Sequence, residues 1–129
     1  INTKIKRREN FRPFAPAIMA EKKNEWFRNN NLNPFMTNVE DILEAKKKII
    51  PAVTHIDGTG RVQTVDINTN HRFYKLIKFF EKQSKVPMLL NTSFNENEPI
   101  VMNPKDAIDC FLRTNMDALA INQFLIIRN

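Results

Sequence analysis

The chain has 129 residues, of which 42% are hydrophobic and 26% are charged, and its formal net charge is +6. This balance predicts one globular domain over residues 1–129, with its own core and a surface suited to anionic ligands. The sequence has one cysteine, Cys110, and no apolar run near the roughly 20 residues of a membrane span. A disulfide framework and a membrane-spanning protein are thereby excluded, and we expect a cytoplasmic location.

Glycine is scarce in this sequence, which contains only Gly58 and Gly60. Two glycines in one loop are too few for a Walker or a dinucleotide-binding fingerprint. Any nucleotide site must therefore be built from side chains. The chain also begins with Ile1 rather than Met, so we expect a fragment of a longer polypeptide.

The first sixteen residues form a cationic segment. Its positive side chains are Lys4, Lys6, Arg7, Arg8 and Arg12. Two prolines prevent a helix over residues 13–16, and the burial of Phe11 and Phe14 would attach the segment to a core. In an extended chain Lys6 and Arg8 share one face, which could bind an anion. A solvated basic terminus explains the same pattern equally well.

The middle of the chain predicts a helix over residues 18–27, a strand over 35–39 and a short charged helix over 40–48. A hairpin follows, with strands 50–56 and 61–65 joined by the turn 57–60, which contains both glycines. His55 and Arg61 flank this turn. A lone histidine is more often structural than catalytic, so the turn alone does not define a site.

A helix capped by Thr69 or Asn70 is predicted to run to about Lys85. Its core-facing stripe follows the i, i+3, i+4, i+7 pattern: Phe73, Leu76, Ile77 and Phe80. The helix leads to an apolar run at residues 88–90, which reads as a central strand covered on both faces. A βαβ crossover would place residues 61–65 and 88–90 in one sheet, with the strands parallel.

Polar side chains gather where this strand ends. They are Asn91, Thr92, Ser93 and Asn95. Ligands of open α/β sheets bind outside the carboxyl ends of strands, and hydroxyl and amide groups suit a phosphate or an acyl group. A simple turn after a strand accounts for the same residues.

The last third of the chain predicts a short strand at residues 100–101 and a helix that begins with Asn103 as its N-cap. The buried face of this helix is expected to contain Ala107, Ile108, Phe111 and Leu112. Residues 117–121 and 124–127 are predicted to be closing strands.

Three blocks of this sequence, residues 6–16, 54–65 and 89–95, together with positions 98–101, 106 and 117–119, match a known family in order and spacing. The chain resembles the C-terminal region of the NodU/CmcH-type O-carbamoyltransferases of nodulation and antibiotic biosynthesis. The resemblance implies an α/β fold, a YrdC-like twisted mixed sheet with helices packed on it. It also implies that ATP and carbamoyl phosphate are used to make carbamoyl adenylate. A separate N-terminal domain, which holds the family's metal, would transfer the carbamoyl group to a hydroxyl acceptor.

The resemblance also assigns residues to the site. YrdC-like domains carry Lys-x-Arg and Ser-x-Asn signatures, which Lys6-Arg7-Arg8 and Ser93-Phe94-Asn95 match. It implies that Lys6 and Arg8 are catalytic. The residues expected to bind ATP and carbamoyl phosphate are Lys6, Arg8, Arg12, His55, Arg61, Ser93 and Asn95. We expect no protein metal ligands here, and Mg²⁺ would arrive with ATP, held mainly by its phosphates.

Two other functions fit parts of the sequence. One is synthesis of threonylcarbamoyl adenylate by a YrdC-type enzyme, against which the blocks at 11–16 and 57–60 argue. The other is RNA binding through the basic surface, which would need exposed aromatic side chains along a groove. We expect neither a nucleic-acid nor a membrane partner. The N-terminal transferase domain is the expected partner, and homodimer formation stays open.

Overall fold

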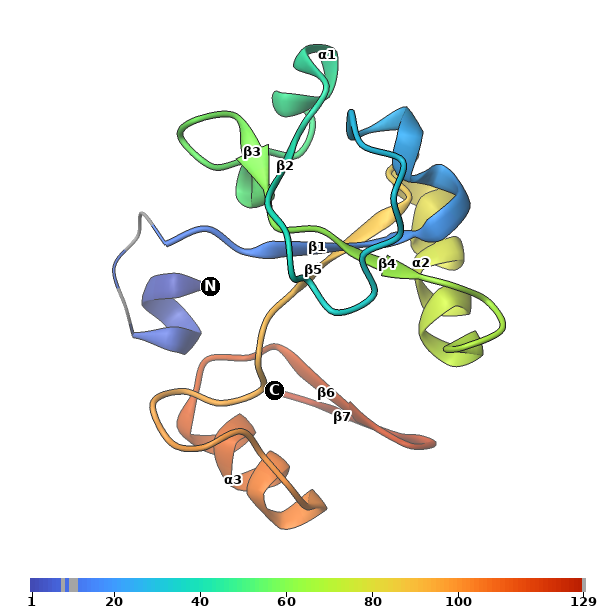
Figure 1. Cartoon of the computed structure of the whole chain (residues 1–129). Coiled ribbons are helices and arrows are strands. Elements are labelled where there is room, and N and C mark those ends of the chain that lie inside the picture. The colour runs from blue at the N-terminus through green and yellow to red at the C-terminus, as the bar shows by residue number, and fades with distance from the viewer. Residues whose placement is uncertain (8, 10–11, 129) are drawn as a thin grey trace. The chain divides into compact units, whose positions relative to one another are not determined.

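The computed structural model describes residues 1–7, 9 and 12–128. It has helices and small sheets, one of which mixes parallel and antiparallel strands, so the predicted α/β class is confirmed (Figure 1). The chain forms two compact units. The first contains Ile1–Arg12 and Ser93–Asn129, and the second contains Pro13–Thr92. Among the described residues, no helix has the length and hydrophobicity required to cross a membrane.

The second unit is built on a three-stranded sheet with the order β4-β1-β5. Strand β1 (Ala15–Met19) pairs in parallel with β4 (Gln63–Val65) and antiparallel with β5 (Met88–Asn91). All five residues of β1 are buried. The prediction that residues 61–65 and 88–90 share a sheet is confirmed. Their predicted parallel orientation is wrong, because β1 lies between them and is parallel to β4 but antiparallel to β5.

The predicted helix over residues 18–27 is also wrong. Ile18 and Met19 belong to β1, and a 3-10 helix, Ala20–Glu25, follows. Trp26 and Phe27 are buried just after it, so all four apolar residues reach the core without an α-helix. Pro16 explains the error, because proline argues against an internal strand, although in this short sheet it is tolerated.

A second, two-stranded sheet pairs β2 (Glu40–Asp41) with β3 (Thr59–Gly60). The predicted hairpin is therefore wrong, since β3 returns to β2 and residues 50–56 contain a 3-10 helix, Pro51–Val53. The predicted strand at 35–39 is absent from the structure, and the predicted helix over 40–48 shrinks to α1 (Glu44–Lys47). Gly58 has a φ of +83°, a left-handed value that favours glycine in the turn before β3.

Helix α2 (His71–Ser84) begins as predicted, with the side chain of Asn70 accepting a hydrogen bond from the backbone N–H of Phe73. It packs on β1 and β5 (Figure 1). Its buried residues are Tyr74 and Ile77. Phe80, predicted to be a core residue, is 41% exposed, and Leu76 is 56% exposed. The inward face is thus rotated from the predicted stripe, because the Tyr74 hydroxyl donates a hydrogen bond to Glu21 and can be buried.

Where the structure describes the first unit, a π-helix, Asn2–Lys6, is accompanied by three further elements of regular structure. They are α3 (Pro104–Arg113), β6 (Ala118–Ile121) and β7 (Phe124–Ile127), and the last two pair as an antiparallel hairpin (Figure 1). The Asn103 cap is confirmed, because its side chain accepts from the backbone N–H of Asp106 at 2.9 Å.

The core of this unit is small. Ala107, Phe111 and Leu119 form its buried centre, and Cys110 is fully buried. Ile108 and Leu112, predicted on the buried face of α3, are 38% and 63% exposed. Residues 100–101 form no strand. Instead, the backbone N–H of Val101 donates one hydrogen bond to the carbonyl oxygen of Phe94, 3.0 Å away.

Candidate functional site

Lys6 is the centre of the candidate site, and it lies at the end of the π-helix with 4% of its surface exposed. The extended segment predicted for this region is therefore wrong at Lys6. Its ammonium Nζ donates to Oγ of Ser93 at 3.1 Å and to the carbonyl oxygen and Oδ1 of Asn95, both at 2.8 Å. A fourth contact joins Nζ to the carbonyl oxygen of Ser93. The two halves of the predicted signature are thus in direct contact.

The loop that meets Lys6 is held by its own hydrogen bonds. The Oγ of Ser93 donates to Oδ1 of Asn95 at 2.6 Å, and Nδ2 of Asn95 donates to the carbonyl oxygen of Glu98 at 2.7 Å. Phe94, between them, packs partly against the core of the first unit. The side chain of Ser93 lies at the surface while Lys6 is buried. The contact between Lys6 and the loop is therefore exposed on the side of Ser93.

Two ion pairs flank this loop. Nε of Arg7 lies 2.8 Å from a carboxylate oxygen of Glu96, and the guanidinium of Arg113 lies 2.7 Å from Oε1 of Glu98. Because these arginines already bind carboxylates, they order the loop in this structure. The second cation of the signature, Arg8, lies outside the described residues.

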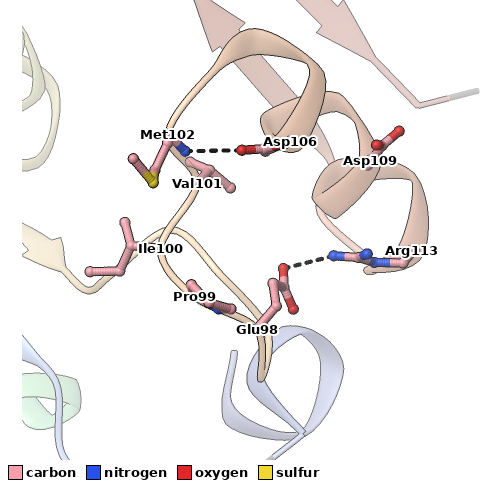
Figure 2. A pocket seen from close by; sticks show the side chains of 8 residues that line it. All are labelled: Glu98, Pro99, Ile100, Val101, Met102, Asp106, Asp109 and Arg113. Carbon is pink, nitrogen blue, oxygen red and sulfur yellow. Dashed lines mark hydrogen bonds and ion pairs between the residues drawn. The ribbon is translucent and has the colours of Figure 1, made fainter.

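Beside Glu98 is a pocket of about 280 Å³, which sequence reasoning did not predict. Figure 2 shows Glu98, Asp106, Asp109 and Arg113 around it, with Arg113 bonded to Glu98. Hydrogen bonds from its own backbone N–H and those of neighbouring residues lower the pKa of Glu98 to about 2. Burial and a hydrogen bond to Glu98 raise the pKa of the Cys110 thiol. Three carboxylates against one guanidinium make this pocket a poor site for phosphate.

The other predicted residues that the structure describes are divided between the two units. Arg12 belongs to the first unit, and its exposed side chain lies 4.0 Å from a carboxylate oxygen of Glu9. His55 and Arg61 belong to the second unit. Arg61 is exposed and follows β3 directly. Lys6, Ser93 and Asn95 are thus the predicted site residues that the structure brings together.

His55 takes part in a polar chain that the sequence analysis missed. Its Nδ1 lies 3.0 Å from Oγ1 of Thr59, and the same Oγ1 donates to Oδ1 of Asp57 at 2.6 Å. The signal was present as Asp57-x-Thr59 in the turn, because Asp and Thr side chains commonly bond within such turns. The two glycines alone are sufficient to predict the turn, so they do not point to this hydrogen bond.

Comparisons with known proteins identify the family of this chain. A family described as carbamoyltransferase C-terminus matches residues 1–128. The chain therefore belongs to the carbamoyltransferase C-terminal family, and the resemblance inferred from the three sequence blocks is confirmed.

Several of the relatives that this chain resembles are nodulation proteins. The chain is 45% identical over 130 residues to nodulation protein NolNO of Sinorhizobium fredii, covering 98% of this chain and 19% of the relative. Nodulation protein NolO of Bradyrhizobium diazoefficiens is also 45% identical, with 98% of this chain and 24% of the relative covered. Nodulation protein U of Azorhizobium caulinodans is 36% identical over 90 residues, which are 70% of this chain and 16% of that protein. The chain thus spans at most about a quarter of the length of these relatives.

Proposed function

We propose that this carbamoyltransferase C-terminal domain binds ATP and carbamoyl phosphate around Lys6, Ser93 and Asn95 and forms carbamoyl adenylate. The observation that carries the proposal is the direct contact of Nζ of Lys6 with both Ser93 and Asn95. A buried ammonium beside a surface hydroxyl and an amide offers a charge and hydrogen-bonding groups to a phosphoryl oxygen. Membership of the carbamoyltransferase family supplies the reaction class.

The proposed reaction has two balanced steps. Water cleaves carbamoyl phosphate to carbamate and inorganic phosphate. An oxygen of the carbamate then attacks the α-phosphorus of ATP, the bond from that phosphorus to the bridging oxygen breaks, and pyrophosphate leaves. Negative charge grows on the phosphoryl oxygens during the attack, so a positioned cation lowers the barrier. Lys6 would supply this charge, with Mg²⁺ bound to the ATP phosphates.

The hydrogen bonds of Lys6 suit an exchange of partners. Its ammonium has three hydrogens, whereas four oxygens of Ser93 and Asn95 lie within hydrogen-bonding distance. The ammonium therefore has one more acceptor nearby than it has hydrogens. A phosphoryl oxygen could replace one of these acceptors, and all three hydrogens would still be hydrogen-bonded. Arg12, in the same unit, and Arg8 would add bidentate contacts to phosphate.

We further propose that the second half-reaction belongs to another part of a longer polypeptide. The chain covers 19% and 24% of the two nodulation proteins to which it is 45% identical. A domain outside the matched region would then transfer the carbamoyl group to a hydroxyl acceptor. The 129-residue chain alone should make carbamoyl adenylate but should not carbamoylate an acceptor.

Exchange of labelled pyrophosphate into ATP tests the first half-reaction. We expect exchange that depends on carbamoyl phosphate and falls at least tenfold in Ser93→Ala. The matched control is Thr92→Ala, which removes a neighbouring exposed hydroxyl and should leave exchange unchanged. Equal exchange by wild type and Ser93→Ala would remove Ser93 from the site. Exchange that depends on threonine and bicarbonate, rather than on carbamoyl phosphate, would favour threonylcarbamoyl-adenylate synthesis.

A further inference from the structure

We propose that the outer edge of strand β5 is the docking site for an extended, apolar segment of the polypeptide outside these 129 residues, which adds a fourth strand to the sheet. The sheet has the order β4-β1-β5, so within the described residues β5 is paired on one side only. A groove of about 210 Å³ lies along β5, entirely within the second unit. The inference rests on the proposal that this chain is part of a longer polypeptide, and it is independent of the adenylation reaction.

The register of β1 and β5 shows which backbone groups of β5 face away from the sheet. The backbone N–H of Met19 donates to the carbonyl oxygen of Pro87, so these two residues are a hydrogen-bonded pair. Such pairs alternate along an antiparallel ladder, which makes Met88 and Leu90 non-hydrogen-bonded positions. Their N–H and carbonyl groups therefore face outward, and in the part of the chain that the structure describes these groups have no hydrogen-bond partner.

These unpaired backbone groups favour a strand as the occupant of the groove. Met88 is buried and Leu90 is half-buried, whereas buried backbone N–H and C=O groups are nearly always hydrogen-bonded. Together the two residues offer two donors and two acceptors, separated by the two-residue repeat of a strand. An extended backbone can satisfy all four groups, as in the addition of a peptide to the edge of a sheet.

The walls of the groove determine the side chains that the occupant must have. Phe80 of α2 lines one wall and residues 49–53 line the other, with Val86 and β5 between them. Leu89 packs in the same cluster as residues of α2, whereas Met88 packs with the segment 49–53, so the two walls lie on opposite faces of the sheet. All of the lining residues are apolar. Because the side chains of an added strand alternate between the two walls, consecutive residues of the occupant must be apolar, as in a strand buried on both faces.

A second copy of this chain does not fit the groove well. Its own β5 is recessed between the same two walls, so pairing two such edges would bring wall against wall. A separate peptide is also disfavoured. An occupant as long as β5, which has four residues, buries far less than the roughly 1,000 Å² of a stable complex between separate molecules.

A segment of the same polypeptide meets both requirements. It can enter the groove as a single strand, and its covalent tether raises its effective concentration to about the millimolar range, so a small contact area suffices. The matched region is 19% and 24% of two nodulation proteins, which leaves more than three quarters of each relative outside it. A polypeptide of that length has ample sequence from which to supply one strand.

Amide hydrogen exchange of the 129-residue chain tests the open edge. The backbone N–H of Leu89 faces β1, whereas that of Leu90, the next residue and of the same type, faces the groove. We expect Leu90 to exchange at least tenfold faster than Leu89 when exchange is followed by NMR. Equal protection of the two amides would mean that the edge is already paired and would overturn the proposal.

Photo-crosslinking of the complete product of the gene that encodes this chain identifies the occupant. The photoreactive residue p-benzoyl-phenylalanine replaces Phe80 in the groove. As the matched control it replaces Phe79, which is also exposed on α2 but lines a separate pocket with lysines. We expect Phe80→p-benzoyl-phenylalanine to crosslink to one apolar segment outside the 129 residues, and the Phe79 variant not to. Ile49→p-benzoyl-phenylalanine, on the opposite wall, should reach the same segment and replaces the Phe80 variant if that variant does not fold.

Four results would contradict the proposal. A crosslink from position 80 to residues 86–90 of another copy would show that the groove joins two chains. Absence of any crosslink outside the 129 residues from both groove positions would show that the groove holds no such segment, and a gene product no longer than this chain would exclude the occupant. In the longer product Leu90 should exchange at least tenfold more slowly than in the 129-residue chain, so an unchanged rate is the fourth. Pyrophosphate exchange that depends on Ser93 is measured separately, so the proposed function can stand if this docking site is refuted.

Discussion

The ammonium of Lys6 lies 3.1 Å from the hydroxyl oxygen of Ser93, although 87 residues separate the two in the sequence. The contact joins the N-terminal π-helix to the loop that precedes α3. Lys6 can thus contribute both to the stability of the first unit and to ligand binding. Different substitutions measure these two contributions separately.

Replacing Lys6 with Met should destabilise the first unit. It leaves acceptors of Ser93 and Asn95 without their charged donor, and hydrogen bonds to charged groups contribute about 1.5–3 kcal/mol each to stability. We expect a loss in that range in urea unfolding followed by circular dichroism. Lys4→Met is the control, because Lys4 lies on the same helix but is exposed. Equal stability of the two variants would contradict a structural contribution of Lys6. The ligand-binding role is then better read from Ser93→Ala.

Ile77 and Phe80 should respond very differently to truncation. Ile77 is fully buried on α2, whereas Phe80 is 41% exposed. Large-to-small changes in a core cost about 2–5 kcal/mol, so Ile77→Ala should fall in that range. Phe80→Ala should cost clearly less. Fluorescence of Trp26, the one tryptophan of the chain and a buried residue of the same unit, measures both. The reverse order would mean that the predicted stripe, rather than the observed one, faces the core.

The hydroxyl of Tyr74 should titrate unusually late. Its hydrogen bond to the carboxylate of Glu21, together with burial, raises its pKa from 10.0 to about 12. A group whose folded pKa is raised contributes stability that is complete below pH 10 and is lost as the pH rises toward 12. Tyr74 is the one tyrosine of the chain, so the absorbance of tyrosinate reports it alone. Glu21→Gln should move the midpoint back toward 10, and a wild-type midpoint at 10 would show that the hydrogen bond does not form.

The buried ion pair of Lys23 and Glu40 should be costly to break from one side. Their side chains are 2% and 3% exposed, and Nζ lies 2.6 Å from Oε2. Removing one partner of a buried pair typically costs about 3–5 kcal/mol, because the other charge stays buried. We expect this loss for Lys23→Met in urea unfolding, and a partial recovery in Lys23→Met with Glu40→Gln. Lys22→Met, which breaks an exposed pair with Glu25, should change little. A double variant less stable than Lys23→Met would refute the interpretation.

Local signals in the sequence predicted the elements that depend on local interactions. The caps at Asn70 and Asn103 correctly place the beginnings of α2 and α3, because a cap needs only residues three positions away. The two strands β6 and β7 are also predicted correctly, and the structure pairs them as a hairpin of sequence neighbours.

Elements set by distant pairing were predicted poorly. Strand β1 is central only because β4 and β5 arrive on either side of it, and Pro16 within it argues locally against a strand. The buried face of α2 was missed for a similar reason. Two adjacent stripes of this helix are apolar. The choice between them depends on Glu21, which is 53 residues away in the sequence and accepts a hydrogen bond from the hydroxyl of Tyr74.

The candidate site, too, could be predicted from the sequence only in part. The resemblance named Lys6, Ser93 and Asn95, and these three residues are in contact in the first unit. Residue spacing could not show that Lys6 is buried or that it ends a π-helix.

The division of the chain has a consequence for its synthesis. The first unit is made from two segments, and the whole second unit lies between them in sequence. On a ribosome, residues 13–92 can fold as they emerge, while Lys6 must wait for Ser93 and Asn95. Closing a loop of this length costs on the order of 4 kcal/mol in chain entropy. A second unit that is already compact brings the ends of the chain closer together and reduces this cost. Lys6 is thus among the first residues of the site to be synthesised, whereas its contacts with Ser93 and Asn95 can form only after the whole second unit has been made.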